Sequence, residues 1–124
     1  MPNKHEESDG QRRFFARARE CGWYVKKLHG GRFQSGLPDC VLIHKVHGTK
    51  WVEFKVPGEP LRSTQKACFF EMHQAGAQIY VFHDEREYDL LFRPPNWISY
   101  VSNPGRVSLP LGFSGKEYRR DRGY

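Results

Sequence analysis

The strongest constraint on the fold is a pair of strand-like segments that a short loop joins into a β-hairpin. The two segments are Cys40–His44 and Lys50–Val56, with His47-Gly48 at the turn between them. The segment Pro57–Pro60 follows directly and forces the chain to turn away from the second strand. Charged residues interrupt this otherwise apolar hairpin, namely Asp39, Glu53 and Lys55.

Helical and strand-like patterns surround the hairpin. They predict a helix over Lys4–Cys21 that begins after an N-cap at Asn3 or Ser8, a strand over Trp23–Leu28, a helix over Ser63–Ala75 capped by Ser63, and a strand over Gln78–His83. The predicted order is therefore αβββαβ. Because the helix before the last strand permits a parallel crossover, we predict an α/β fold with a mixed central sheet flanked by helices.

The chain has 124 residues, which suffice for one domain with a single modest core. A short helix is predicted from Asp84 to Leu91, and Pro94-Pro95 stops it. The residues beyond are rich in Pro, Gly and Ser and end in a basic aromatic run. We therefore predict a core over residues 1–93 and a basic C-terminal extension over residues 94–124.

The charge balance favours a polyanionic partner. The sequence carries 20 Lys and Arg residues against 14 Asp and Glu residues, a formal charge of +6 at pH 7, which suits nucleic acid or an acidic membrane surface. Its 3 cysteines form no C-x-x-C pair, so neither a disulfide framework nor a zinc site is indicated, and the reducing cytoplasm is the expected compartment. No apolar run approaches the length of a membrane span and no apolar leader segment opens the sequence, so we expect no membrane association.

The charged residues of the hairpin have a common direction. Residues two apart on a strand share a face, so Glu53 and Lys55 project together while Phe54 points to the other side. Asp39 joins them only if the hairpin pairs residues whose numbers sum to an even value. An even register requires a three-residue loop or a bulge around residues 46–48.

This arrangement is typical of a metal-assisted phosphoryl-transfer site. Two carboxylates within a few ångströms repel each other and are stabilised by a hard divalent cation, for which Mg²⁺ is the natural candidate. Such a cation polarises a phosphoryl oxygen and activates water. Lys55 supplies a positive charge that offsets the charge of the transition state.

Both predicted helices add a polar group to the site. Gln65 shares a helical face with Cys68, Phe69 and Met72, so its amide is expected to reach the sheet from the positive start of the helix. On the first helix, Glu7 shares the face of Phe14 and should point inward. Glu6 lies on the solvated, arginine-bearing side of that helix.

The ordered set Pro38-Asp39, Glu53-Phe54-Lys55 and Gln65 resembles the PD-(D/E)XK nuclease superfamily. The closer resemblance, over roughly Glu7 to Asp84, is to the virus-type replication-repair nuclease family, abbreviated VRR-NUC. Members read G-x-P-D, a hydrophobic strand, E-x-K, a Pro-containing loop, a Gln entering a helix, then Gly and a final apolar strand. The ordered combination is far more specific than any one motif. The resemblance implies a restriction-endonuclease-like fold.

The resemblance also implies an activity, namely a Mg²⁺- or Mn²⁺-dependent phosphodiesterase that cuts DNA and leaves 5′-phosphate and 3′-hydroxyl ends. It gives catalytic roles to Asp39, Glu53, Lys55 and Gln65, and metal ligation to Glu7, Asp39, Glu53 and the backbone carbonyl of Phe54. Short stand-alone members resemble Holliday-junction resolvases and work as dimers, whereas the domain fused to larger proteins acts on flaps or other branched DNA. A homodimer acting on branched DNA is therefore expected, in the cytoplasm, or in the host cytoplasm if the protein is phage-encoded.

Basic residues near the predicted site are candidates for DNA contacts, namely His29, Arg32, Lys50, Arg62 and Lys66. His44 and His47 have His-x-x-His spacing, but no Cys or acidic residue completes a metal site, and we interpret them as structural or solvated. Two alternatives to a branched-DNA endonuclease are a non-catalytic DNA-binding module of the same fold and a flap or restriction-type nuclease. A pure DNA-binding module has no need of an acidic pair that repels phosphate.

Overall fold

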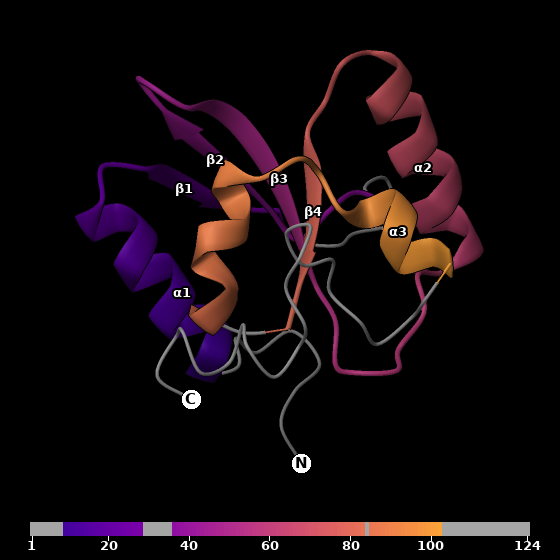
Figure 1. The fold of residues 1–124 in the computed structure, drawn as a ribbon, viewed down its shortest axis with the longest axis horizontal. Helices are drawn as coiled ribbons and strands as arrows, with labels where there is room; N and C mark the ends of the chain where they lie inside the picture. Colours follow the sequence, from indigo (N-terminus) through magenta and orange to yellow (C-terminus); the bar gives the residue numbers. More distant parts are fainter. Residues whose placement is uncertain (1–8, 29–35, 84, 103–124) are drawn as a thin grey trace.

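A mixed four-stranded sheet in the order β1-β2-β3-β4 forms the centre of the fold (Figure 1). The computed structural model describes residues 9–28, 36–83 and 85–102. The elements along the chain are α1 (Asp9–Glu20), β1 (Tyr24–Lys27), β2 (Cys40–His44), β3 (Gly48–Phe54), α2 (Ser63–Gln74), β4 (Ile79–Phe82), the 3₁₀ helix η2 (Glu85–Phe92) and α3 (Trp97–Ser102). β1, β2 and β3 are antiparallel neighbours, and β4 lies parallel to β3 after the α2 crossover. The predicted αβββαβ order, the mixed sheet and the α/β fold class are confirmed.

The hairpin of β2 and β3 has the even register. Cys40 pairs with Val52, and His44 pairs with Gly48, so the two residue numbers in each pair add up to an even value. The three residues from Lys45 to His47 form the loop. Gly48 has a φ of 77°, a backbone conformation that glycine adopts without steric strain. The even register that the site requires is present, and of the two predicted connections the three-residue loop is observed, one residue earlier than expected.

The helix α2 begins at Ser63 as predicted, but a different residue caps it. Arg62 has an extended backbone with φ −70° and ψ 158°, and its N–H donates to Gln65 Oε1 at 2.9 Å. The predicted N-cap at Ser63 is therefore wrong by one residue, because the glutamine side chain holds the backbone one position earlier. The predicted start of the first helix, at Asn3 or Ser8, lies outside the described residues.

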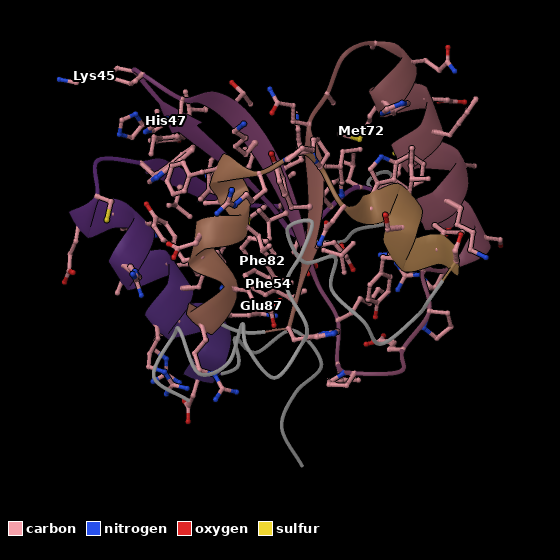
Figure 2. All side chains as sticks on the ribbon, in the orientation of Figure 1. Lys45, His47, Phe54, Met72, Phe82 and Glu87 are labelled. Carbon is pink, nitrogen blue, oxygen red and sulfur yellow. The ribbon has the colours of Figure 1, made fainter. Side chains whose placement is uncertain are left out.

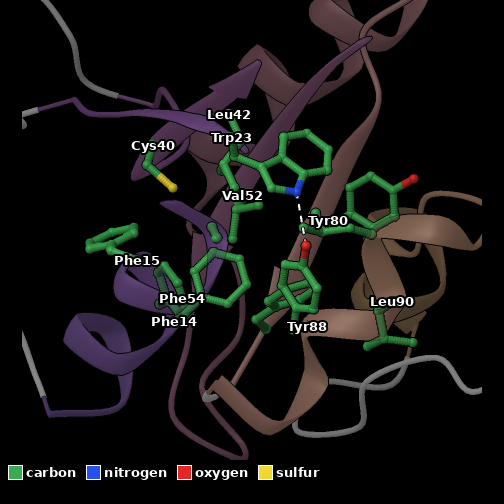
Figure 3. Close-up of a cluster of buried hydrophobic side chains, with 13 residues drawn as sticks. Phe14, Phe15, Trp23, Cys40, Leu42, Val52, Phe54, Tyr80, Tyr88 and Leu90 are labelled. Atoms are coloured by element: carbon green, nitrogen blue, oxygen red, sulfur yellow. Dashed lines mark hydrogen bonds between the residues drawn. The ribbon is translucent and has the colours of Figure 1, made fainter. Parts of the chain in front are cut away.

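The two faces of the sheet are covered by different helices. α1 and η2 cover one face, called here the α1 face, and α2 and α3 cover the other, called the α2 face (Figure 1). On the α1 face, Val52 and Phe54 of β3 belong to a cluster of buried, mostly aromatic side chains with Phe14 (Figure 3). Trp23 Nε1 donates to Tyr88 Oη at 2.9 Å within this cluster. Both polar groups of that buried pair are thereby satisfied.

The α2 face has a smaller apolar core beside its charged residues. Its fully packed members are Leu61, Phe69, Ile79, Val81, Trp97 and Tyr100, and Trp51, Cys68 and Met72 pack against them. The apolar stripe predicted for the second helix thus meets the sheet. No helix in the described part of the chain is long and apolar enough to cross a membrane.

Residues after the predicted core boundary at residue 93 contribute to the fold. Asn96 closes the outer edge of β4, since its Oδ1 accepts from Val81 N–H at 2.7 Å and its Nδ2 donates to the Val81 carbonyl at 3.0 Å. Trp97 and Tyr100 of α3 are buried on the α2 face, at 5% and 0% exposure. The core therefore extends through α3, because these two rings bury apolar surface that the sheet would otherwise expose. Residues 103–124 lie outside the described part of the chain.

Candidate active site

Asp39 lies directly before β2, at the end of the hairpin opposite the loop. Its backbone carbonyl accepts from Leu28 N–H at 2.7 Å, and its Oδ2 accepts from Phe54 N–H at 2.8 Å. Because the register is even and successive side chains alternate, Asp39 shares the α2 face with Glu53. Its Oδ1 accepts no hydrogen bond from the described residues and is available to a ligand.

Glu53 is buried, with 4% of its surface exposed. Its Oε2 accepts from Gln65 Nε2 at 2.8 Å and lies 3.5 Å from Lys55 Nζ. Its Oε1 is buried and has no hydrogen-bond partner within the described residues. A buried carboxylate oxygen without a donor is energetically unfavourable unless a cation or water reaches it.

Lys55 is held at the end of β3 through its backbone as well as its side chain. Its N–H donates to the Phe82 carbonyl at 2.9 Å, which extends the pairing of β3 with β4 by one residue. Its ammonium lies 3.5 Å from Glu53 Oε2 and 3.5 Å from Glu59 Oε2. The charge of Lys55 is therefore placed between two carboxylates on the α2 face.

Gln65 connects the start of α2 to the acidic pair. Its Oε1 accepts from Arg62 N–H at 2.9 Å, and only the amide oxygen can accept, so the orientation of the amide is determined. The Nε2 group consequently points to Glu53, where it donates at 2.8 Å. At 2% exposure this amide orients the carboxylate from inside the protein.

Gly36 sets how closely the loop before Asp39 approaches α2. Its φ is +95°, and a Cβ at this position would lie 2.7 Å from the Thr64 carbonyl oxygen. Real Cβ atoms do not approach a backbone oxygen so closely, so a side chain would push the loop away from the helix. The glycine thus lets the chain just before Asp39 pack against the helical turn that carries Gln65.

The surroundings of Asp39 and Glu53 destabilise the charged form of both carboxyl groups. Burial and, to a lesser extent, the Asp39 carboxylate raise the pKa of Glu53 to about 7, against the opposing effects of Lys55 and Gln65. Burial also raises the pKa of Asp39, and the Phe54 N–H and the charges of Lys55 and Arg62 oppose this effect. Two like charges brought out of water together explain both directions.

The arrangement fits a hard divalent cation. Among the described residues, Asp39 Oδ1 and Glu53 Oε1 accept no hydrogen bond, and oxygen ligands are those that Mg²⁺ and Mn²⁺ prefer. Two other metal ligands were predicted. The Phe54 carbonyl belongs to the residue between Glu53 and Lys55. Glu7 lies outside the described residues. Within residues 9–28, 36–83 and 85–102, no group of three or more His, Cys, Asp or Glu side chains is arranged to hold a metal ion.

The structure brings together the four residues predicted as catalytic, and it separates some of the predicted DNA contacts from them. Arg62 and Lys66 are exposed at the first turn of α2, next to Gln65. Lys50 lies earlier on β3 with 9% exposure, and its ammonium donates to Gln78 Oε1 and lies over the Tyr80 ring. Its charge is therefore engaged on the α1 face and not directed to the site. His29 and Arg32 lie outside the described residues.

The two histidines of the hairpin have structural contacts. His44 Nδ1 accepts from Val46 N–H at 3.0 Å, so the ring's Nε2 donates to the Cys21 carbonyl at 3.1 Å. His47 stacks on Trp23 with ring centroids 5.8 Å apart. Figure 2 shows His47 at the tip of the hairpin, away from Phe54 at the other end of β3.

Glu59 is a residue that the sequence analysis did not place near the site. Val56 and Glu59 are the ends of a β-turn, since Glu59 N–H donates to the Val56 carbonyl at 3.0 Å and Gly58 has a φ of +88°. The turn brings the side chain of Glu59 back to Lys55. The Pro57-Gly58 dipeptide is the signal that predicts this reversal, because Pro suits the second and Gly the third position of a type II turn.

Comparison with known proteins identifies a structural relative. One solved structure, described as a VRR_NUC domain, matches with a TM-score of 0.57 and 26% sequence identity, and the match covers 66% of this chain and 88% of that chain. No protein-family model matches the chain, and no curated protein matches it. Because the match spans most of that structure, it concerns the domain as a whole and not a single motif.

Proposed function

Because this chain belongs to the VRR-NUC family of nuclease-type domains, we propose that it is a metal-dependent DNA endonuclease acting on branched DNA such as a four-way junction. The observation that carries the proposal is the connected set of four side chains at one end of β3. Gln65 donates to Glu53, Lys55 pairs with Glu53, and Asp39 lies on the same face. This is the composition expected for hydrolysis of a phosphodiester bond with a divalent cation.

Each residue has a distinct task in the proposed reaction. Asp39 and Glu53 would hold the cation through the oxygens that accept no hydrogen bond from the described residues, and a cation bound there would supply Lewis-acid polarisation of the scissile phosphate. Gln65 keeps the Glu53 carboxylate in one orientation. Lys55 orients the attacking water and offsets the negative charge that develops on the phosphate. As water forms its bond to phosphorus, the P–O3′ bond breaks, which leaves a 5′-phosphate and a 3′-hydroxyl.

Charge near the site supports a DNA substrate. The exposed side chains of Arg62 and Lys66 lie at the positive end of α2, where phosphate groups are favoured. The formal charge of +6 adds a general attraction to a polyanion. A four-way junction has two equivalent strands to cut, so we propose that a homodimer presents one site to each strand.

The proposed function is tested with a panel of DNA substrates. A four-way junction, a 5′ flap and a linear duplex are incubated with the protein in Mg²⁺, in Mn²⁺ or in EDTA. We expect cleavage that requires the metal and is fastest on the four-way junction. Absence of cleavage of every substrate in both metals would overturn the enzyme, and binding without cleavage would establish the DNA-binding module instead. Equal cleavage of the linear duplex would reject selectivity for branched DNA.

A further inference from the structure

Lys55 is held by hydrogen bonds of its backbone as well as by the ion pairs of its side chain. Besides the bond from its N–H to the Phe82 carbonyl, the carbonyl of Lys55 accepts from His83 Nδ1 at 2.7 Å. Because a carbonyl only accepts, the Nδ1 of His83 carries the proton. The backbone of Lys55 is thus immobilised on both sides, and its ammonium position depends on the carboxylates around it.

Glu59 differs from Glu53 in the tasks that its carboxylate performs. Its Oε1 accepts from Val56 N–H at 3.1 Å, and its Oε2 lies 3.5 Å from Lys55 Nζ. In the proposed function, Glu53 binds the metal. Glu59 has no such role, and within the described residues the cation that it pairs with is Lys55. The Glu59 side chain is 45% exposed, so it lies where the site opens to solvent.

Tyr100 connects the helix α3 to both neighbours of Lys55. The ring is fully buried, its hydroxyl donates to the Glu59 carbonyl at 2.6 Å, and its ring lies edge-on to His83 with centroids 6.0 Å apart. The hydroxyl fixes the turn that carries the Glu59 carboxylate. α3 follows the segment from Glu7 to Asp84 over which the sequence resembles VRR-NUC domains, so this support is added to the family's motif residues.

We propose that Glu59 and Tyr100 are positioning residues that hold the Lys55 ammonium toward the scissile phosphate. The inference rests on the proposed nuclease function for its kinetic consequences. Glu59 contacts the lysine directly, and Tyr100 acts through the backbone of Glu59. A lysine side chain has four rotatable bonds, and a carboxylate fixed by a turn and by a buried hydroxyl restricts them at the charged end.

The substitution Glu59→Gln tests the charge alone. The amide oxygen of glutamine still accepts from Val56 N–H, while the negative charge beside Lys55 is lost. We expect kcat for junction cleavage to fall about 10- to 100-fold, the range that misplacement of a catalytic group by about 1 Å produces, with KM unchanged within about twofold. Glu71→Gln, the same change at an exposed position of α2, is the matched control and should leave both constants unchanged.

The substitution Tyr100→Phe tests the connection through α3. It keeps the ring in the core and removes the hydroxyl that holds the Glu59 carbonyl. We expect kcat to fall about tenfold. If both residues act through Lys55, the double variant loses less than the product of the two single losses. A loss equal to that product would overturn the shared action.

A measurement without DNA or metal separates this proposal from the proposed function. In ¹⁵N NMR spectra, an ammonium with 2% side-chain exposure and two carboxylate partners should give a resonance that exchanges slowly with water. We expect Glu59→Gln and Tyr100→Phe to broaden the Lys55 ammonium resonance and Glu71→Gln to leave it unchanged. An unchanged resonance in both site variants would overturn the positioning role. This result is obtained even if no DNA substrate is cleaved.

Discussion

Successive residues at the end of the β3 segment point alternately to the α1 face and the α2 face. The two faces bury these residues to a similar degree but differ in their chemistry. Val52 and Phe54 are 0% and 9% exposed on the α1 face, while Glu53 and Lys55 are each 4% exposed on the α2 face. Alternation along one strand is enough to separate them. Depth of burial alone therefore does not indicate whether a residue stabilises the fold.

Neighbouring residues of β3 make opposite contributions to the free energy of folding. On the α1 face, Phe54 contacts Phe14, Phe15 and Phe82 edge to face, with ring centroids 5.3, 5.8 and 6.3 Å apart. Such contacts add to the gain from burying apolar area. On the α2 face, burial raises the pKa of Glu53 to about 7, which means that its charged form is destabilised in the fold. We infer that the aromatic cluster around Phe54 stabilises the fold and that the buried charge of Glu53 reduces this stability.

The largest expected effect is a loss of cleavage activity when a charged residue of the α2 face is removed. If the protein cleaves junctions as proposed, Lys55→Ala should reduce kcat by about 10⁴-fold or more, because the proposed reaction places Lys55 at the reacting atoms. Junction affinity, measured by fluorescence anisotropy in EDTA, should change only a few-fold. Lys45→Ala at the exposed tip of the hairpin is the control (Figure 2). Retained cleavage in Lys55→Ala would remove Lys55 from the mechanism.

The second expected effect is a loss of stability when a buried ring of the α1 face is removed. Phe14→Ala removes a fully buried ring from the α1 face and should lower the free energy of unfolding by about 3 to 5 kcal/mol. Phe70→Ala, which truncates a ring that is 54% exposed on α2, should change it by less than about 0.5 kcal/mol. Urea denaturation measures both, and Phe14→Leu provides a milder change if the alanine variant does not fold. Equal losses at the two positions would contradict the contribution of the buried α1-face cluster to stability.

The smallest expected effect is on the pH dependence of stability without metal. The pKa of Glu53 is raised from 4.5 to about 7 in the fold, so between these values the folded protein binds more protons than the unfolded chain. Its stability should therefore decrease as pH rises through this window. In EDTA, the melting temperature of the wild type should fall by a few degrees between pH 5 and pH 7, and that of Glu53→Gln should fall less.

Metal provides the control for that measurement. At pH 7.5, Mg²⁺ should raise the melting temperature of the wild type, because a ligand that binds only the folded state stabilises it, and should leave Glu53→Gln nearly unchanged. An equal decrease with pH in both proteins would contradict the raised pKa of Glu53. An equal response to Mg²⁺ would contradict its role as a ligand.

The convergence of Asp39, Glu53, Lys55 and Gln65 was accessible from the sequence because it depends on local periodicity. Strand alternation places Glu53 beside Lys55, helical periodicity turns Gln65 inward, and the hairpin register decides only the side of Asp39. The fold class follows from the same patterns together with the parallel crossover.

The remaining features depend on contacts between residues far apart in the chain, which periodicity does not report. Tyr100 meets Glu59 across 41 residues, and Lys50 bonds to Gln78 across 28 residues. Lys50 was predicted as a DNA contact because it is a basic residue close to the site in sequence, but strand alternation places its side chain on the α1 face, where it meets Tyr80. The N-cap of α2 differs from the prediction for a local reason, because the Gln65 amide oxygen accepts from the N–H of Arg62, one residue before the predicted cap.

The side chain of Asn96 has a consequence for how the molecule meets its own copies. An edge strand exposes N–H and carbonyl groups that can template the addition of another strand. On β4, both groups of Val81 are already bonded to a single amide, at 2.7 and 3.0 Å. Another chain would have to displace Asn96 before pairing there. At Val81 the sheet is therefore closed to edge-to-edge aggregation by one side chain, without a further strand.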